Sequence, residues 1–203
     1  AREKEVPPSE KDLKRVLDLV DCRNIMISQE GKIFLKKRGM SIDLSGIAKG
    51  YAVDKAFELL KTLGYKNLIV NAGGDLRAGG SKLNQSWSIG IQDPRIPEKI
   101  IAKLSLTEGA IATSGDYEKF FIYQGKRYHH IFNPRNGLPA EECQSVTTLC
   151  KTGMIADAMA TAIFVLGPER GYSLCQRVGG IDCLIVDRDG KIIFSPNLKG
   201  FIS

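Results

Sequence analysis

The amino-acid sequence predicts an α+β fold with a largely antiparallel sheet, and two observations lead to this prediction. Short segments of strand type follow one another directly along the chain and are joined by turns around glycine, as in β-hairpins. Segments with helical periodicity come between them at irregular intervals, whereas a parallel sheet needs a regular alternation of strand and helix. No internal repeat, low-complexity tract or linker interrupts the 203 residues, so we expect a single domain over residues 1–203.

The composition is ordinary for a soluble globular protein, with 43% apolar and 26% charged residues. The sequence contains no run of about 18 apolar residues that would span a membrane. The net charge of +6 is spread along the chain and favours anionic partners in general. Because no basic helix and no interleaving of basic and aromatic residues is found, we expect no nucleic-acid partner. A phosphate-bearing small molecule fits the charge.

The five cysteines are an odd number without a Cys-x-x-Cys pair, which argues against a zinc site and against a disulfide framework. We therefore expect mostly buried, free thiols. They are Cys22, Cys143, Cys150, Cys175 and Cys183.

The N-terminal part predicts one helix and three short strands. Ser9 and Asp12 form a capping-box pattern at the start of an apolar stripe with helical spacing, which runs from Leu13 to Val20. Strands are expected over residues 24–28, 32–36 and 40–44, the last because apolar and polar residues alternate there.

A turn at Ser45-Gly46 and a helix that ends at Gly64 follow the third strand. Lys49 lies in the first turn of this helix, where the helix N-terminus carries partial positive charge. A lysine is unfavourable there unless it and the free backbone N–H groups converge on an anion. Two interpretations are open, an anion site at Lys49 or a solvated surface lysine.

Two segments in the middle of the chain carry polar residues suited to ligand binding. Gly73-Gly74-Asp75 either lets the backbone approach a ligand closely or makes a tight turn with an ordinary aspartate. The hydroxyls of Thr113 and Ser114 suit phosphate or a ring edge but are also common in loops. The remaining strands are expected over residues 67–71, 87–93, 99–106, 118–123, 127–132, 145–150, 182–187 and 191–195, and helices over 153–166 and 169–178.

The two histidines, His129 and His130, are adjacent in a predicted strand and therefore point to opposite faces. A histidine in a strand is usually structural. The turn-rich segment 133–137 directly after the strand raises the odds that one of the pair is functional.

The predicted helix over residues 153–166 is apolar nearly all round and should therefore be buried. Its main polar residues, Asp157 and Thr161, are four residues apart and lie on one face. A buried carboxylate needs a partner, which can be Mg²⁺ with its preference for oxygen ligands, a lysine, or backbone N–H groups.

Five segments together resemble the ApbE family, the FAD:protein FMN transferases. They are residues 42–54 (Ile-Asp-Leu-Ser-Gly-Ile-Ala-Lys-Gly-Tyr-Ala-Val-Asp), 71–75, 112–117, 130–137 and 156–162. The resemblance covers essentially the whole chain but only the C-terminal portion of a family member. It implies an ApbE-like fold in which the family's N-terminal portion is lacking.

The resemblance also implies a set of site residues, with FAD as substrate and Mg²⁺ as cofactor. Asp43, Lys49 and the Ile131 backbone would contact FAD, and Asp75, Thr113 and Ser114 are added as the polar residues of two matching segments. The Mg²⁺ ligands would be the Gly46 and Ala160 main-chain oxygens, the Asp157 carboxylate and the Thr161 hydroxyl.

The reaction that the resemblance implies is phosphoryl transfer to an acceptor flavoprotein. A threonine hydroxyl of the acceptor attacks the FMN-side phosphorus of FAD, and AMP leaves. Lys49 and Mg²⁺ would neutralise charge on the phosphoryl oxygens. His130 is the candidate general base on pKa grounds, with Asp157 as the alternative. The open alternatives are an FAD pyrophosphatase, a flavin-binding protein without turnover, and an inactive fragment.

Members of this family are often lipoproteins on the outer side of the bacterial inner membrane. We therefore expect a cell-envelope location that faces the periplasm or the cell exterior, with membrane contact only through a lipid anchor outside this chain. The sequence shows no signal peptide, and unpaired cysteines fit an oxidising compartment poorly.

Overall fold

A computed structural model describes residues 5–198, which divide into two compact units. The first unit comprises residues 5–43 and 119–140, and the second comprises residues 44–118 and 141–198. The single domain expected over residues 1–203 extends beyond the described residues and stays a prediction.

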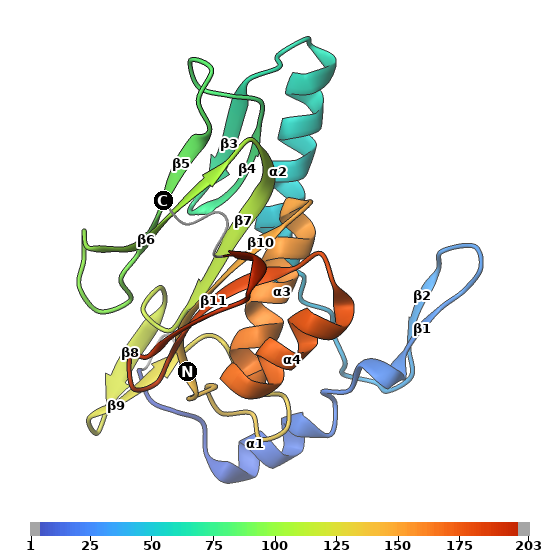
Figure 1. The fold of residues 1–203 in the computed structure, drawn as a ribbon. Coiled ribbons are helices and arrows are strands. Elements are labelled where there is room, and N and C mark those ends of the chain that lie inside the picture. The colour runs from blue at the N-terminus through green and yellow to red at the C-terminus, as the bar shows by residue number, and fades with distance from the viewer. Residues whose placement is uncertain (1–4, 199–203) are drawn as a thin grey trace. The chain divides into compact units, whose positions relative to one another are not determined.

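The second unit is built on a six-stranded sheet in which every pair of neighbouring strands is antiparallel. The strand order is β12-β11-β10-β7-β4-β3 (Figure 1). The α+β prediction with an antiparallel sheet is thereby confirmed. The strands are β3 (Leu68–Ala72), β4 (Asp75–Gly79), β7 (Glu108–Gly115), β10 (Cys143–Cys150), β11 (Asp182–Asp187) and β12 (Ile192–Phe194).

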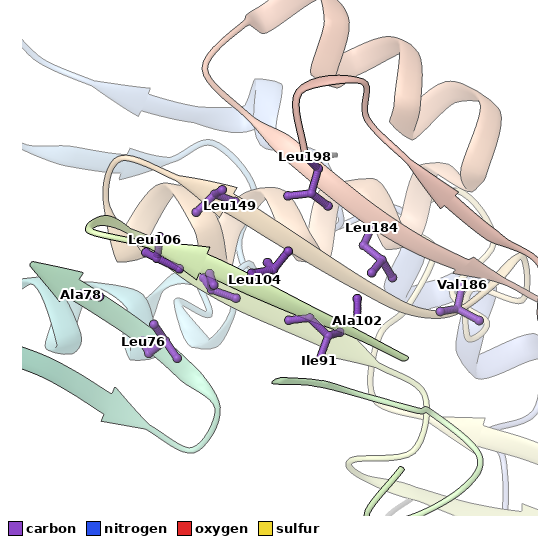
Figure 2. Close-up of a cluster of buried hydrophobic side chains, with 11 residues drawn as sticks. Leu76, Ala78, Ile91, Ala102, Leu104, Leu106, Leu149, Leu184, Val186 and Leu198 are labelled. Atoms are coloured by element: carbon purple, nitrogen blue, oxygen red, sulfur yellow. The ribbon is translucent and has the colours of Figure 1, made fainter. Parts of the chain in front are cut away.

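A separate hairpin packs against one face of this sheet and closes the hydrophobic core. It consists of β5 (Trp87–Gln92) and β6 (Ile100–Leu106). Burial of apolar side chains from both layers is the main stabilising contribution here. The core (Figure 2) contains Leu76, Ala78, Ile91, Ala102, Leu104, Leu106, Ile111, Leu149, Leu184, Val186 and Leu198.

Three helices pack on the sheet of the second unit (Figure 1). They are α2 (Ser45–Thr62), α3 (Gly153–Leu166) and α4 (Pro168–Val178). The bounds of α3 are those predicted, because Gly167 with φ +80° ends it and Pro168 begins the next helix. None of the helices described between residues 5 and 198 is long and apolar enough to cross a membrane.

The first unit contains one helix and two hairpins. The helix α1 (Glu10–Leu17) begins as predicted, since the hydroxyl of Ser9 accepts a hydrogen bond from the backbone N–H of Asp12 at 3.2 Å. The other elements are η1 (Cys22–Asn24), β1 (Ile25–Ile27), β2 (Ile33–Leu35), β8 (Phe120–Tyr123) and β9 (Lys126–His129).

Three predictions about the elements were wrong. Residues 40–44 form no strand, because alternating polarity is not enough without a neighbouring strand to pair with. The first helix ends at Leu17, so Val20 lies outside it. The helix α3 is not buried all round, since Met154 is 41% and Ile155 is 44% exposed.

The cysteines are free thiols, as predicted. Cys22 is exposed and the other four are buried. Burial raises the pKa of Cys143 and of Cys150 to about 12, so both remain protonated at neutral pH and are poor nucleophiles.

Candidate functional site

The candidate site lies in the second unit, where the first turns of α2 meet α3 and the strands β4 and β7. The ammonium nitrogen of Lys49 on α2 is 3.0 Å from Oδ2 of Asp75, the first residue of β4. The turn between β3 and β4 needs positive φ at Gly73 (+63°) and Gly74 (+99°), which glycine adopts without strain. Lys49 is therefore an ion-paired, half-exposed lysine, and its binding of a further anion stays a prediction.

Asp75 is deeply buried, with 2% of its surface exposed. Its Oδ1 accepts a hydrogen bond from the Thr113 backbone N–H at 3.4 Å, whereas Oδ2 has the ion pair with Lys49 but no directed hydrogen bond from the described residues. Burial raises the pKa of the Asp75 carboxyl above its usual range. Lys49 opposes this rise, and the negative charge of Asp157 adds to it.

Asp157 reaches α2 from the face of α3. It is 4% exposed, and its Oδ2 accepts a hydrogen bond from the backbone N–H of Gly50 at 3.0 Å. In a regular α-helix the same N–H faces the carbonyl oxygen four residues earlier, that of Gly46, about 3 Å away. The Gly46 carbonyl oxygen and the Asp157 carboxylate therefore lie within about 6 Å of each other. Two predicted metal ligands are thus close, although 107 residues separate the partners Gly50 and Asp157.

Thr161 lies one turn after Asp157 on α3 and brings a hydroxyl to the same region. Its Oγ1 is 3.0 Å from the Ser114 hydroxyl oxygen of β7, in a hydrogen bond that either group can donate. A Cβ added to Gly46 would be 3.8 Å from this Thr161 oxygen, so the start of α2 lies against Thr161. Ala160, the remaining predicted metal ligand, precedes Thr161 and is fully buried.

Thr113 contributes through its backbone rather than through its hydroxyl. Successive residues of β7 point to opposite faces of the sheet, so Thr113 and Ser114 cannot both face α3. The Thr113 hydroxyl is 2.8 Å from the hydroxyl of Thr147, its partner on β10. Its role in FAD binding stays a prediction.

The other predicted residues, Asp43, His130 and Ile131, belong to the first unit, so their part in the site stays a prediction. His130 is exposed, and its Nδ1 lies 3.3 Å from the carbonyl oxygen of Lys119. The neighbouring His129 is buried. Its Nδ1 accepts from the Ile131 N–H at 3.2 Å, so Nε2 carries the proton and donates to the Ala140 carbonyl at 2.8 Å. His129 is the structural member of the pair.

The donors around α2 and α3 suit a hard cation. Within residues 5–198, no group of three or more His, Cys, Asp or Glu side chains gathers as a transition-metal site would need. A carboxylate, a hydroxyl and main-chain oxygens are instead the ligands that Mg²⁺ takes, with water and phosphate oxygens completing its shell. The buried negative charge of Asp75 and Asp157 also favours a cation. The residues fit Mg²⁺, and its assignment stays a prediction.

The sequence patterns missed two residues that hold this site together. Asp54 of α2 accepts hydrogen bonds from the backbone N–H groups of Gly153 (2.7 Å) and Met154 (2.9 Å), at the start of α3. Arg77 of β4 pairs with Asp54 at 3.0 Å. A signal was available in the sequence, because Gly-Tyr-Ala-Val-Asp at 50–54 and Gly-Met-Ile-Ala-Asp at 153–157 share the spacing Gly-x-x-x-Asp.

An apolar pocket of about 350 Å³ lies in the first unit, between α1 and the β8–β9 hairpin with the loop that follows. Its walls include Leu13, Leu17, Phe121, Tyr128 and Phe132. These walls offer no positive charge to an anion such as pyrophosphate.

Comparisons with known proteins agree with this picture. The model of the ApbE family matches residues 1–185. The FAD:protein FMN transferase of Klebsiella pneumoniae (strain 342) is 31% identical over 93% of this chain, and that of Treponema pallidum (strain Nichols) is 33% identical over 94%. The chain spans 59% and 58% of the length of these two relatives.

Solved structures with the same fold are similarly related in sequence. The crystal structure of the ApbE protein from Thermotoga maritima has a TM-score of 0.92 and 37% identity, and covers 100% of this chain and 67% of its own. The flavin transferase ApbE from Vibrio cholerae has a TM-score of 0.85 and 31% identity, and covers 97% of this chain and 64% of its own. With a family match over most of its length and the same fold, this chain belongs to the ApbE family.

Proposed function

We propose that this chain is a Mg²⁺-dependent FAD:protein FMN transferase, which moves FMN from FAD to a threonine hydroxyl of an acceptor flavoprotein. The observation that carries the proposal is that Asp157 and Thr161 of α3 lie against the first turns of α2, which also carry Lys49. The names of the relatives, FAD:protein FMN transferase, support the same reaction.

In the proposed reaction the threonine oxygen bonds to the FMN-side phosphorus, and the bond from that phosphorus to the bridging oxygen breaks. AMP leaves with the bridging oxygen, and the threonine proton passes to a base. Lys49, held at the edge of the site by Asp75, offsets negative charge on the phosphoryl oxygens. Bound Mg²⁺, held by the Asp157 carboxylate, the Thr161 hydroxyl and the main-chain oxygens of Gly46 and Ala160, would supply further charge neutralisation.

Two proposals complete the assignment. His130 is the proposed base for the threonine proton, with Asp157 as the alternative. The cell envelope is the proposed location, on the family resemblance described above. Fractionation of cells that express the native gene tests the location, and recovery of the protein in the cytosol would contradict it.

The test is to incubate the chain with FAD, Mg²⁺ and a threonine-bearing acceptor, then to measure acceptor mass and free AMP. Transfer adds the mass of FMN to the acceptor and releases AMP in equal amount. AMP without a mass change would make the chain an FAD pyrophosphatase. Binding of FAD without AMP would make it a flavin-binding protein without turnover.

Lys49→Ala separates a binding role from a structural one. We expect weaker FAD binding and slower AMP release with only a modest fall in the melting temperature, because Lys49 is half-exposed and the buried Asp75 can take up a proton once its cation is removed. Lys55→Ala is the matched control, since Lys55 lies on the same helix over the ring of Tyr51. Titration with FAD and thermal melting measure both effects. A variant that melts far lower and binds FAD normally would make Lys49 structural.

A further inference from the structure

We propose that Asp54 is a positioning residue, which holds the start of α3 against α2 so that Asp157 and Thr161 face the first turns of α2. The proposal rests on the proposed function for the role of Asp157 and Thr161. The carboxylate of Asp54 serves α3 with both oxygens, since Oδ1 accepts from Gly153 N–H and Oδ2 accepts from Met154 N–H.

Asp54 takes the part that an N-cap side chain normally plays. The first N–H groups of a helix have no partner within the helix and are usually satisfied by the residue just before it. That residue is Thr152, which has the extended backbone of an N-cap but makes no side-chain cap bond. The start of α3 is therefore fixed to another helix instead of to its own connecting loop.

The two helices also touch along their backbones at the same level. A Cβ added to Gly50 would lie 2.1 Å from the carbonyl oxygen of Gly153, and one added to Gly153 would lie 2.7 Å from the carbonyl oxygen of Gly50. Only two glycines allow this approach. The position of α3 relative to α2 is thus set by backbone contact as well as by the carboxylate of Asp54.

The hydrogen bonds between the helices are reciprocal. Gly50 and Asp54 lie one turn apart on α2, and Gly153 and Asp157 lie one turn apart on α3. Asp54 accepts from Gly153 N–H, and Asp157 accepts from Gly50 N–H. A shift of α3 that breaks the first bond therefore moves Asp157 away from Gly50, and with it from the Gly46 carbonyl oxygen.

Arg77 fixes the orientation of Asp54. Its Nη1 lies 3.0 Å from Asp54 and 2.8 Å from Glu58, and its guanidinium lies over the ring of Phe57 at 4.4 Å. The side chains of Arg77 and Asp54 are 11% and 16% exposed, so their charges are well shielded from water. Glu58 shares the guanidinium of Arg77 with Asp54, and its side chain is 59% exposed.

The experiment compares Asp54→Asn and Asp54→Ala with the matched control Glu58→Gln. For the Asp54 variants we expect a loss of Mg²⁺ affinity of about 10- to 100-fold, as for other residues that orient metal ligands. The control removes a partner of Arg77 only, so its Mg²⁺ affinity should stay within about twofold of the unchanged chain. Calorimetric titration with Mg²⁺ alone, and with Mg²⁺ and FAD, gives these values. Equal losses in Glu58→Gln would overturn the proposal.

A second variant separates positioning from simple helix capping. Thr152→Asp in the Asp54→Ala background restores a cap from the ordinary position but not the link to α2. We expect the melting temperature to recover in part, because the ion pair with Arg77 stays lost, and the Mg²⁺ affinity to stay low. If both recover, Asp54 is merely a cap and the positioning role is refuted.

Amide exchange of Gly50 tests the proposal without any ligand. The Gly50 N–H donates to Asp157, so a rise in exchange at Gly50 that exceeds the rise elsewhere on α2 reports movement of Asp157 in the Asp54 variants. We expect faster exchange at Gly50 as well as at Gly153 and Met154. Unchanged exchange at Gly50 would overturn the positioning role. If the unaltered chain binds neither Mg²⁺ nor FAD, the proposed function fails, and the exchange at Gly50 still decides the role of Asp54.

Discussion

Asp54 and Asp157 are two carboxylates in matching places with different surroundings. Each follows a glycine by four residues, and each accepts a hydrogen bond from the glycine N–H of the opposite helix. Asp54 has in addition the Met154 N–H and the Arg77 guanidinium. Asp157 has one hydrogen bond from the described residues, and a second carboxylate, that of Asp75, raises the local negative charge.

The difference shows how one geometry serves two purposes. The charge of Asp54 is fully compensated inside the protein, which suits a residue that fixes structure. The charge of Asp157 is compensated only in part, which leaves it suited to an external cation. The substitutions below test this contrast, beginning with the one that removes the shared contact.

Gly50→Ala should have the largest effect, since it pushes the two helices apart. The new Cβ would lie 2.1 Å from the Gly153 carbonyl oxygen, a backbone atom that no side-chain rotation can move away. We expect a loss of about 3 kcal/mol or more in the free energy of unfolding, together with loss of Mg²⁺-dependent AMP release.

Gly46→Ala is the matched control for stability in the same helix. Its Cβ would make an ordinary contact at 3.8 Å from Thr161, and alanine favours the helix over glycine. Denaturant unfolding of both variants measures the difference. Similar stability of the two variants would show that the close helix contact is not important.

Alanine substitutions of Asp54 and Asp157 should differ in their effect on stability. Asp54→Ala leaves the shielded Arg77 with only the exposed Glu58 as a carboxylate partner and leaves α3 without its cap, so we expect a loss of about 3 kcal/mol in the free energy of unfolding. Asp157→Ala should change the metal-free protein by less than about 1 kcal/mol, because the Gly50 N–H keeps its helical partner and repulsion with Asp75 disappears.

When Mg²⁺ and FAD are added, Asp157 should contribute to stability. Mg²⁺ with FAD should raise the melting temperature of the unaltered chain by mass action and leave that of Asp157→Ala unchanged. Asp157→Ala should also release no AMP. If the metal-free Asp157→Ala protein melts well below the unaltered one, while the latter ignores Mg²⁺ and FAD, Asp157 is structural and the catalytic proposal fails.

The sequence predicts local structure well where a helix or strand carries its own signals. The bounds of α3 follow from Gly167 and Pro168, and the hairpins follow from glycine turns between apolar segments. The strand prediction for residues 40–44 was wrong, because five residues do not show whether a partner strand lies beside them. The strand β4 was not predicted, since Asp75 and Arg77 look solvent-exposed in sequence but are both buried.

The same limit applies to the site. Lys49 and Asp157 drew attention because a charge beside a helix start or in an apolar helix is unfavourable by itself. Asp54 drew none, because an aspartate in an amphipathic helix is unremarkable until the start of another helix is found against it. Local patterns therefore reveal charges that lack a nearby partner. A charge that caps a distant helix is found in the sequence only by comparing segments, as with the Gly-x-x-x-Asp spacing shared by residues 50–54 and 153–157.

Asp75→Asn should have a smaller effect that depends on pH. Burial raises the pKa of Asp75 above the ordinary 3.8. Lys49 lowers this pKa, and the negative charge of Asp157 raises it further. The native state therefore binds the proton more tightly than the unfolded state. This stabilisation is complete below about pH 3.8 and is lost as the pH rises through the raised pKa.

Asp75→Asn lacks this titration. Relative to the unaltered chain, it should gain stability as the pH rises from 4 to 7 in metal-free buffer. Urea unfolding at several pH values measures the gap between the two proteins. A gap that stays constant or narrows with rising pH would mean that the pKa of Asp75 is not raised.

Thr152→Ala should have the smallest effect, although its position alone predicts a larger one. Removing an N-cap threonine usually costs about 1 kcal/mol. Here the Thr152 hydroxyl is buried without a hydrogen-bond partner among the described residues, and Asp54 already satisfies Gly153 and Met154. Loss of an unsatisfied buried hydroxyl is neutral or slightly stabilising, so we expect a change within about 0.5 kcal/mol.

Ser9→Ala is the contrasting variant, because the Ser9 hydroxyl does accept from the first turn of α1. Amide exchange at the first turn of each helix provides one readout for both. It should become faster at Asp12 in Ser9→Ala and stay unchanged at Gly153 and Met154 in Thr152→Ala. Faster exchange at Gly153 in Thr152→Ala would mean that the threonine, and not the aspartate of the neighbouring helix, holds the start of α3 in solution.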